Sequence, residues 1–121
     1  MSRSIKFRQR NKNNGSFWHW GMLNGIWENP KRQDNYIHPS ESDQFTGLLD
    51  RNGKEIWEGD IVRDSDGSMG QIEYGAKDYP SFIIRYFKPQ LDEGHSWIWS
   101  QFVKEELEVV GDIYSNPELL K

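Results

Sequence analysis

The stretch from Gln44 to Val62 constrains the fold more than any other part of the chain. Within it, Asn52-Gly53 stands between two runs of apolar residues. Asn and Gly adopt positive φ readily, as the tight turn of a twisted hairpin requires, so the pair predicts a β-hairpin. Further on, Gly59-Asp60 predicts a second turn that leads into the β-branched Ile61-Val62. The residues expected to serve structural turns are Gly47, Asn52, Gly53, Gly59 and Asp60.

Composition limits the class of protein. The chain has 121 residues, which suits one domain or a small domain with an N-terminal subdomain. Hydrophobic residues are only 35%, but six Trp raise the aromatic share to 14%, so large rings can supply core area. The absence of Cys excludes disulfide and thiolate chemistry. Because no apolar run approaches the ~20 residues of a membrane helix and no signal peptide follows Met1, we expect a soluble intracellular protein.

The order of apolar and turn residues predicts an all-β fold. Alternation at residues 5–8 and the aromatic run at 16–23 predict an N-terminal β-hairpin, and residues 24–43 read as a long irregular connection. Further strands are expected around residues 56–62, 69–75, 81–87, 96–100 and 107–114, with helical turns at 103–106 and 116–120. Short strands joined by polar turns favour a small barrel or roll over residues 44–121, preceded by a hairpin subdomain over residues 1–43.

Charge is distributed unevenly along the chain. Residues 1–37 hold seven Lys and Arg against two acidic residues, a net charge of +5, and the remainder carries −9. Such a basic segment can bind the phosphates of a nucleic acid, or it can dock on the acidic remainder of its own chain or of a neighbouring copy. The cations that would contact a nucleic acid or a partner are Arg3, Lys6, Arg8, Arg10 and Lys12.

The tryptophans are the other candidates for partner contact. Trp18 and Trp20 share one face of an expected strand, and Trp97 and Trp99 share one face of another. Aromatic rings on a small barrel can bind a peptide or stack on bases. They can equally fill a core that is poor in aliphatic residues, and any ring left outside would favour self-association.

No pattern of residues indicates catalysis. His19, His38 and His95 are too widely spaced for a local metal motif. Asp64-Ser65-Asp66-Gly67 resembles the start of a calcium loop, but Gly75 stands near the position of the bidentate Glu, so we interpret it as a turn. The sequence contains no phosphate-cradling glycine loop and no nucleophile elbow. We therefore expect no enzyme, no cofactor, no metal and no small-molecule ligand.

Three blocks of the chain resemble the YopX family of phage and prophage proteins. The central block, residues 44–62, is similar to that family's central motif, residues 5–8 to its N-terminal signature, and residues 107–120 to its C-terminal one. The blocks stand in family order and span nearly the whole chain. One departure is that the family signature has a Trp soon after Arg8, where this chain has Gln9-Arg10.

The resemblance implies an SH3-like barrel over about residues 44–121 and a phage or prophage origin in the cytoplasm of a bacterial host. It supplies no established activity and no catalytic residues. Together with the charge pattern, it leads us to expect a non-enzymatic binding or assembly module that forms homo-oligomers. The alternative is a nucleic-acid-binding accessory protein that uses the basic N-terminal strand, and a host or phage protein is a further candidate partner.

Overall fold

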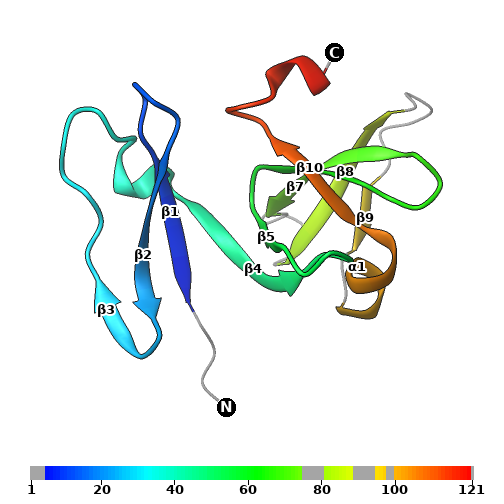
Figure 1. Cartoon of the computed structure of the whole chain (residues 1–121), viewed down its shortest axis with the longest axis horizontal. Helices are drawn as coiled ribbons and strands as arrows, with labels where there is room; N and C mark the ends of the chain where they lie inside the picture. Colours follow the sequence, from blue (N-terminus) through cyan, green and yellow to red (C-terminus); the bar gives the residue numbers. More distant parts are fainter. Residues whose placement is uncertain (1–4, 75–80, 89–94, 98–99, 121) are drawn as a thin grey trace. The chain divides into compact units, whose positions relative to one another are not determined.

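The computed structural model describes residues 5–74, 81–88, 95–97 and 100–120 (Figure 1). The chain divides into two compact units, Met1–Gly47 and Leu48–Lys121. The strand β4, Asp43–Leu49, runs from the first unit into the second.

The first unit is built on an antiparallel sheet, drawn in blue and cyan in Figure 1. Its other strands are β1 (Lys6–Arg10), β2 (Phe17–Leu23) and β3 (Ile26–Glu28), and the short 3-10 helix η1 covers Pro39–Glu41. The strand order is β3-β2-β1-β4-β5, in which β5 (Glu55–Trp57) comes from the second unit, so β3 lies at one edge. Lys6 pairs with Gly21 and Arg10 with Phe17, which makes β1 and β2 the hairpin that alternation predicts.

The expectation of an irregular connection over residues 24–43 is wrong in part. Leu23 pairs with Ile26, so Asn24-Gly25 is a two-residue hairpin turn, and both of its residues have positive φ (51° and 82°). These values match the mirror-image turn that fits the twist of a hairpin. The connection therefore begins with strand β3 and ends with η1 and the start of β4.

The second unit holds the remaining strands and the one α-helix of the described residues. Its elements are β5 (Glu55–Trp57), β6 (Asp60–Arg63), β7 (Met69–Tyr74), β8 (Phe82–Lys88), β9 (His95–Trp97), α1 (Ser100–Glu106), β10 (Glu108–Asp112) and η2 (Pro117–Leu120). Its sheet has the order β10-β6-β7-β8-β9, with antiparallel pairing throughout. The helix α1 is longer than the single turn expected at residues 103–106, and it begins where the sequence predicts the end of a strand.

Aliphatic side chains fill the core of the second unit. The fully enclosed cluster consists of Ile56, Val62, Ile72, Ile84, Val103 and Leu107. Leu48, Phe82, Tyr86 and Val109 pack around it. Val103 comes from α1, so this helix covers part of the cluster. The all-β class predicted from the sequence is confirmed. Among the described residues, the enclosed cluster consists of β-branched and leucine side chains, and Trp57 is buried as well, at 4% exposure.

Candidate functional site

Three cations of β1 lie on one face of the first sheet. Lys6, Arg8 and Arg10 alternate along the strand and therefore share a face. The Lys6 ammonium lies 4.5 Å from the ring centroid of Phe45, and the Arg8 guanidinium lies 4.2 Å from that of Phe17. Arg10 approaches the same Phe17 ring at 6.0 Å. Each cation is thus held over an aromatic ring, a contact that attracts a charge to the ring face.

Arg8 is enclosed in the sheet rather than presented at its surface. It pairs with Asp43 across β1 and β4, and Arg8 Nε lies 3.5 Å from Asp43 Oδ2. The two residues are only 7% and 6% exposed. A buried charge requires a partner of opposite sign, and here each side chain supplies it for the other. A phosphate at this face would therefore meet Lys6 and Arg10 rather than Arg8, while Arg3 lies outside the described residues.

The opposite face of the same sheet carries rings. Phe7 and Trp20 stack with their centroids 4.5 Å apart, and Trp27 meets Trp20 edge-on at 6.2 Å. The indole N–H of Trp18 donates to the carbonyl of Asn29 and that of Trp20 to Ser42 Oγ, both at 3.0 Å. Trp18 and Trp20 are thus half-buried and hydrogen-bonded within their own unit. Of the other two predicted tryptophans, Trp97 belongs to β9, but its side chain and all of Trp99 lie outside the described residues.

A buried glutamine holds the loop that follows β3. Gln9 is 0% exposed, and its Nε2 donates to the carbonyls of Lys31 (3.2 Å) and Ile37 (2.7 Å). Its Oε1 accepts from the Lys31 N–H at 2.6 Å. Backbone bonds add to this anchoring, since Lys12 N donates to Asn35 O at 2.6 Å and Ile37 N to Arg10 O at 3.1 Å. The loop is therefore fastened to β1 at several points along its length.

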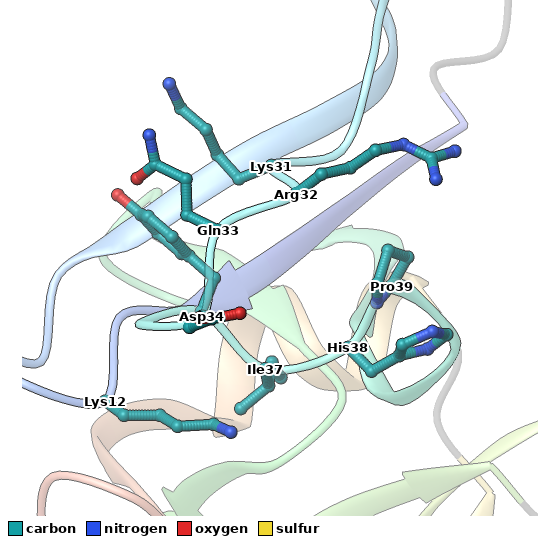
Figure 2. Close-up of a pocket in the computed structure, with 9 residues that line it drawn as sticks. Lys12, Lys31, Arg32, Gln33, Asp34, Ile37, His38 and Pro39 are labelled. Atoms are coloured by element: carbon teal, nitrogen blue, oxygen red, sulfur yellow. The ribbon is translucent and has the colours of Figure 1, made fainter.

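This loop encloses a pocket of about 480 Å³. Residues 31–34 and 36–39 line it, together with Lys12 from the turn after β1. Figure 2 shows Lys12 near one end of the loop and Arg32 near the other, with Asp34 between them, whereas Lys31 points away from His38 and Pro39. The ammonium of Lys31 lies 4.4 Å from the Trp18 ring centroid. The charged groups at the hollow are therefore Lys12, Arg32 and Asp34.

The ring of His38 is fixed at the rim of this pocket. Its Nδ1 accepts from the backbone N–H of Ser40 at 3.1 Å and lies 2.8 Å from Ser40 Oγ. An Nδ1 that accepts a hydrogen bond carries no proton, so the ring's N–H is at Nε2 and is available as a donor. His38 also caps η1, which explains why it precedes Pro39.

The edge strand β3 exposes large apolar side chains. Ile26 is 64% exposed, Trp27 54%, and the neighbouring Met22 of β2 38%. The N–H of the Trp27 indole donates to Asn29 Oδ1 at 3.0 Å. An exposed apolar sheet edge is a surface on which a further strand can pair.

The residues predicted to form turns between Gly47 and Asp60 have backbone roles. The Asp60 carboxylate accepts from the N–H of Trp57 at 2.8 Å, and Gly59 has φ of 89°. Gly47 is in β4 with φ of 87°. Asn52-Gly53 forms a wider turn than expected, because only Gly53 has positive φ and Asp50 bonds to Lys54 across it. Asn52, Gly53 and Gly59 thus lie in turns, whereas Gly47 lies within β4 and Asp60 begins β6.

The acidic side chains of the loop between β6 and β7 likewise accept hydrogen bonds from backbone groups of the same loop. Asp64 Oδ1 accepts from the N–H of Asp66, and Asp66 Oδ1 accepts from that of Ser68. Burial raises the pKa of Asp64, while hydrogen bonding with Asp64 and then Ser68 lowers the pKa of Asp66 to about 2. Burial also raises the pKa of Tyr86, whose hydroxyl donates to Asp64, to about 12. Over the described ranges, no group of His and acidic residues has the arrangement of a metal site.

Sequence reasoning missed Gln9, the edge strand β3 and the pocket. A signal for β3 was present in Asn24-Gly25, which has the same residue types as Asn52-Gly53. No local signal marks Gln9, because its bonding partners are 22 and 28 residues away. The pocket could not be predicted for the same reason, because it forms only where these distant residues fasten the loop to β1.

None of the helices in the described ranges has both the length and the apolar character needed to cross a bilayer.

The chain is similar to known proteins over almost its full length. The family model described as YopX protein matches residues 6–121. Among curated proteins, none matches the chain. A similar solved structure is that of protein EF1440 from Enterococcus faecalis, with a TM-score of 0.62, 22% identity, and coverage of 99% of this chain and 100% of that one. At that identity the likeness concerns the fold alone, whereas the family match extends across both units. This chain therefore belongs to the YopX protein family.

Proposed function

We propose that this YopX-family chain works without catalysis as a binding and assembly module that associates with copies of itself. The setting we propose is the cytoplasm of a bacterial host that carries a phage or prophage. For residues 44–121 we propose an SH3-like barrel, supported by the consecutive antiparallel strands β6, β7 and β8 around one aliphatic core. The observation that carries the proposal of self-association is the exposed edge strand β3.

The backbone of β3 is suited to pairing with its own copy. Residues that flank a two-residue hairpin turn exchange both of their backbone hydrogen bonds, and here these are Leu23 and Ile26. Since successive residues alternate, the N–H and C=O of Trp27 point to the free edge. Two β3 strands can pair antiparallel about a two-fold axis at Trp27 and exchange both of these bonds.

The side chains of β3 define the register of such a dimer. With Trp27 opposite its own copy, Ile26 stands opposite Glu28 of the second copy. No like charges face each other across the pair, and the exposed ring of Trp27 gains an apolar neighbour. The net charge of +5 on residues 1–37 opposes the approach of two first units, so salt strengthens this association. If instead the basic first unit docked on the acidic remainder of a neighbouring copy, the association would weaken as the salt concentration rises.

The test is the mass in solution, measured by sedimentation equilibrium over a range of protein concentrations at about 0.1 M and about 0.5 M salt. We expect a dimer whose dissociation constant falls as salt rises. A monomer at millimolar concentration in both salts contradicts the proposal of self-association. A dissociation constant that rises with salt contradicts pairing at β3.

Two substitutions at one position make the register itself testable. Ile26→Glu places a carboxylate opposite Glu28 of the second copy and is expected to weaken the dimer tenfold or more. Ile26→Lys places an opposite charge there and is expected to preserve the dimer. Because Ile26→Lys adds to the net positive charge of the first unit, general repulsion alone predicts the reverse order. Leu49→Lys, which alters an exposed apolar residue of β4, is the control and is expected to change nothing.

A second candidate function, nucleic-acid binding by the basic strand, is supported by the array of Lys6 and Arg10 over Phe45 and Phe17. Such binding predicts an affinity for single-stranded DNA or RNA that falls steeply with salt. Lys6→Ala with Arg10→Ala is expected to remove it. Absence of any binding at low salt contradicts this alternative.

A further inference from the structure

We propose that Asn24, in the turn between β2 and β3, is a site of spontaneous deamidation in the folded chain, and that isoaspartate formed there releases β3 from β2. This modification is separate from self-association and would occur in a monomer as well. The chain has three pairs in which Gly follows Asn, namely Asn14-Gly15, Asn24-Gly25 and Asn52-Gly53.

Deamidation at an Asn-Gly pair needs only the two residues and water. The backbone nitrogen of Gly attacks Cγ of Asn, and a C–N bond forms as the bond from Cγ to Nδ2 breaks. The side-chain amide leaves as ammonia with the proton that the Gly N–H gives up. Water then opens the succinimide at either carbonyl, which yields aspartate or isoaspartate. Because Gly has no side chain to shield its nitrogen, all three pairs have a reactive sequence. The surrounding structure therefore decides their rates.

The two reacting groups of Asn14-Gly15 are both engaged in hydrogen bonds. The N–H of Gly15 donates to the carbonyl of Asn11 at 2.9 Å. The Asn14 Oδ1 accepts from the backbone N–H of Ser16 at 2.9 Å and from its hydroxyl at 2.7 Å. Attack at this pair must break these bonds, each of which stabilises the unreacted turn.

Asn52-Gly53 is held in a similar way. The N–H of Gly53 donates to the carbonyl of Asp50 at 3.0 Å, and Nδ2 of Asn52 donates to Glu108 Oε2 at 3.4 Å. The backbone N–H of Asn52 donates to the buried carboxylate of Asp50 at 2.9 Å. The nitrogen that would attack and the amide that would leave are thus both held.

Asn24-Gly25 lacks such contacts. Across the part of the chain that the structure describes, no hydrogen bond is formed by the side chain of Asn24 or by the N–H of Gly25. Both residues are exposed, and a Cβ on Gly25 would meet nothing within 4 Å. Of the three pairs, this is therefore the one whose reacting groups are free to approach each other.

The backbone of this turn must rotate for the reaction, and its place in the fold makes rotation easy. Asn24 has φ of 51°, and the rotation brings the Gly25 nitrogen to Cγ. The following strand β3 has three residues, lies at the edge of the sheet and pairs with β2 (Figure 1). Short segments at an edge open locally at a lower free energy than strands in a core.

Isoaspartate at position 24 changes the turn itself. The backbone then runs through the side-chain carbon and gains one atom between residues 24 and 25. The two-residue turn that pairs Leu23 with Ile26 depends on a fixed backbone geometry with positive φ at both central residues. A longer backbone does not close this turn, so β3 loses its pairing with β2. The proposed dimer at β3 would weaken as a result, and this last step alone rests on the proposed function.

The test is incubation of the full chain at mildly alkaline pH, with mass-spectrometric peptide mapping of the three pairs over time. In the folded chain we expect Asn24 to react about tenfold faster than Asn14 and Asn52. In guanidinium chloride we expect similar rates at all three, because the protecting contacts are gone. Reaction at Asn14 or Asn52 as fast as at Asn24 in the folded chain overturns the proposal. An Asn24 that stays intact when folded but reacts when unfolded also overturns it.

A substitution beside Asn14 tests the cause of the difference. Ser16→Ala removes one of the hydrogen bonds to Asn14 Oδ1 and is expected to raise the rate at Asn14 about threefold, with no change at Asn24. Ser40→Ala, which removes a hydroxyl that contacts His38, is the matched control and should change neither rate. An unchanged rate at Asn14 in Ser16→Ala overturns the assignment of protection to hydrogen bonding.

Release of β3 is measured on the isoaspartate form after its chromatographic separation. We expect the amide hydrogen of Ile26 to exchange at least about tenfold faster than in the parent chain. Asn24→Asp carries the new charge without the added backbone atom and should keep the parent's protection. Equal protection in the isoaspartate form overturns the release of β3. Sedimentation of the same samples reports the dimer. A monomeric parent chain contradicts self-association, whereas the reaction and exchange rates still decide this inference.

Discussion

Asp50 and Val109 lie 59 residues apart in sequence, and the carboxylate of Asp50 accepts the backbone N–H of Val109 at 2.8 Å. The other carboxylate oxygen accepts the N–H groups of Asn52 (2.9 Å) and Lys54 (2.8 Å) within its own turn. Asp50 is only 2% exposed. One buried carboxylate therefore joins the β4–β5 turn to the last strand of the second unit.

Removal of this carboxylate should destabilise the second unit strongly. Asp50→Ala leaves three backbone N–H groups without their acceptor, and we expect the free energy of unfolding to fall by about 2–4 kcal/mol. Asp50→Asn keeps one acceptor oxygen for the turn but presents an amide to Val109, so a smaller loss of about 1–2 kcal/mol is expected. Urea unfolding followed by tryptophan fluorescence measures both. Equal effects of the two substitutions would contradict the assignment of separate roles to the two oxygens.

Gly70 of β7 should be intolerant of any side chain. A Cβ at this position would lie 2.4 Å from Ile84 Cγ2 and 2.9 Å from the carbonyl oxygen of Arg85. Because Ile84 belongs to the enclosed core and Arg85 O is backbone, neither can move away easily. We expect Gly70→Ala to cost about 2–3 kcal/mol of stability.

The matched control is Gly67, where a Cβ would meet nothing within 4 Å but φ is 92°. Gly67→Ala therefore carries only the cost of a left-handed backbone, about 1 kcal/mol. The comparison in urea distinguishes a steric clash from backbone strain. A loss at Gly67 as large as that at Gly70 would show that the clash is relieved by movement of the strands.

Glu108 should contribute to the acid sensitivity of the fold. Its carboxylate lies 2.8 Å from an Arg63 nitrogen and 3.0 Å from one of Arg51, and the hydrogen bond from Arg63 is the main reason that its pKa lies below the ordinary value of 4.5. A folded-state pKa that is lowered stabilises the fold above the unfolded-state pKa, and this contribution is lost as the pH falls through the folded-state value. The stability difference between the parent chain and Glu108→Gln should therefore be largest near neutral pH and should shrink as the pH falls below 4.5.

Chemical unfolding at a series of pH values measures this difference. Glu41→Gln, which changes an exposed residue of η1, serves as the control for loss of a negative charge. A Glu108→Gln difference that stays constant from neutral to acid pH would mean that packing, rather than ionisation, accounts for it.

Hairpins could be predicted from the sequence only where the turn residues were interpreted correctly. Asn24-Gly25 and Asn52-Gly53 have the same composition, yet Asn24 adopts positive φ and closes a two-residue turn, whereas Asn52 does not. At Asn52, the buried Asp50 carboxylate accepts two amides of the turn and so stabilises a wider loop. An Asn-Gly pair therefore predicts a turn, but the side chains around it decide which turn forms.

The roles of the aromatic residues depended on tertiary contacts. Alternation correctly separates Phe17 from Trp18 and Trp20 on the two faces of β2. It does not predict that aliphatic residues enclose the core of the second unit while Trp18 and Trp20 stay half-buried on a sheet of the first. Composition gives the number of aromatic rings, but the contacts that form in the folded chain decide which of these rings are buried.

The sequence alone determined the all-β class, the turn at Gly59 that leads into β6 and the family to which the chain belongs. These features are encoded by neighbouring residues, since backbone preferences and side-chain alternation act over a few positions. Only the tertiary structure decided that Arg8 is enclosed with Asp43, that Gln9 fastens the loop after β3, and that Lys12 lines one pocket together with that loop. Each of these depends on groups brought together from distant positions, and a hydrogen bond or ion pair forms only when the fold places both partners within reach.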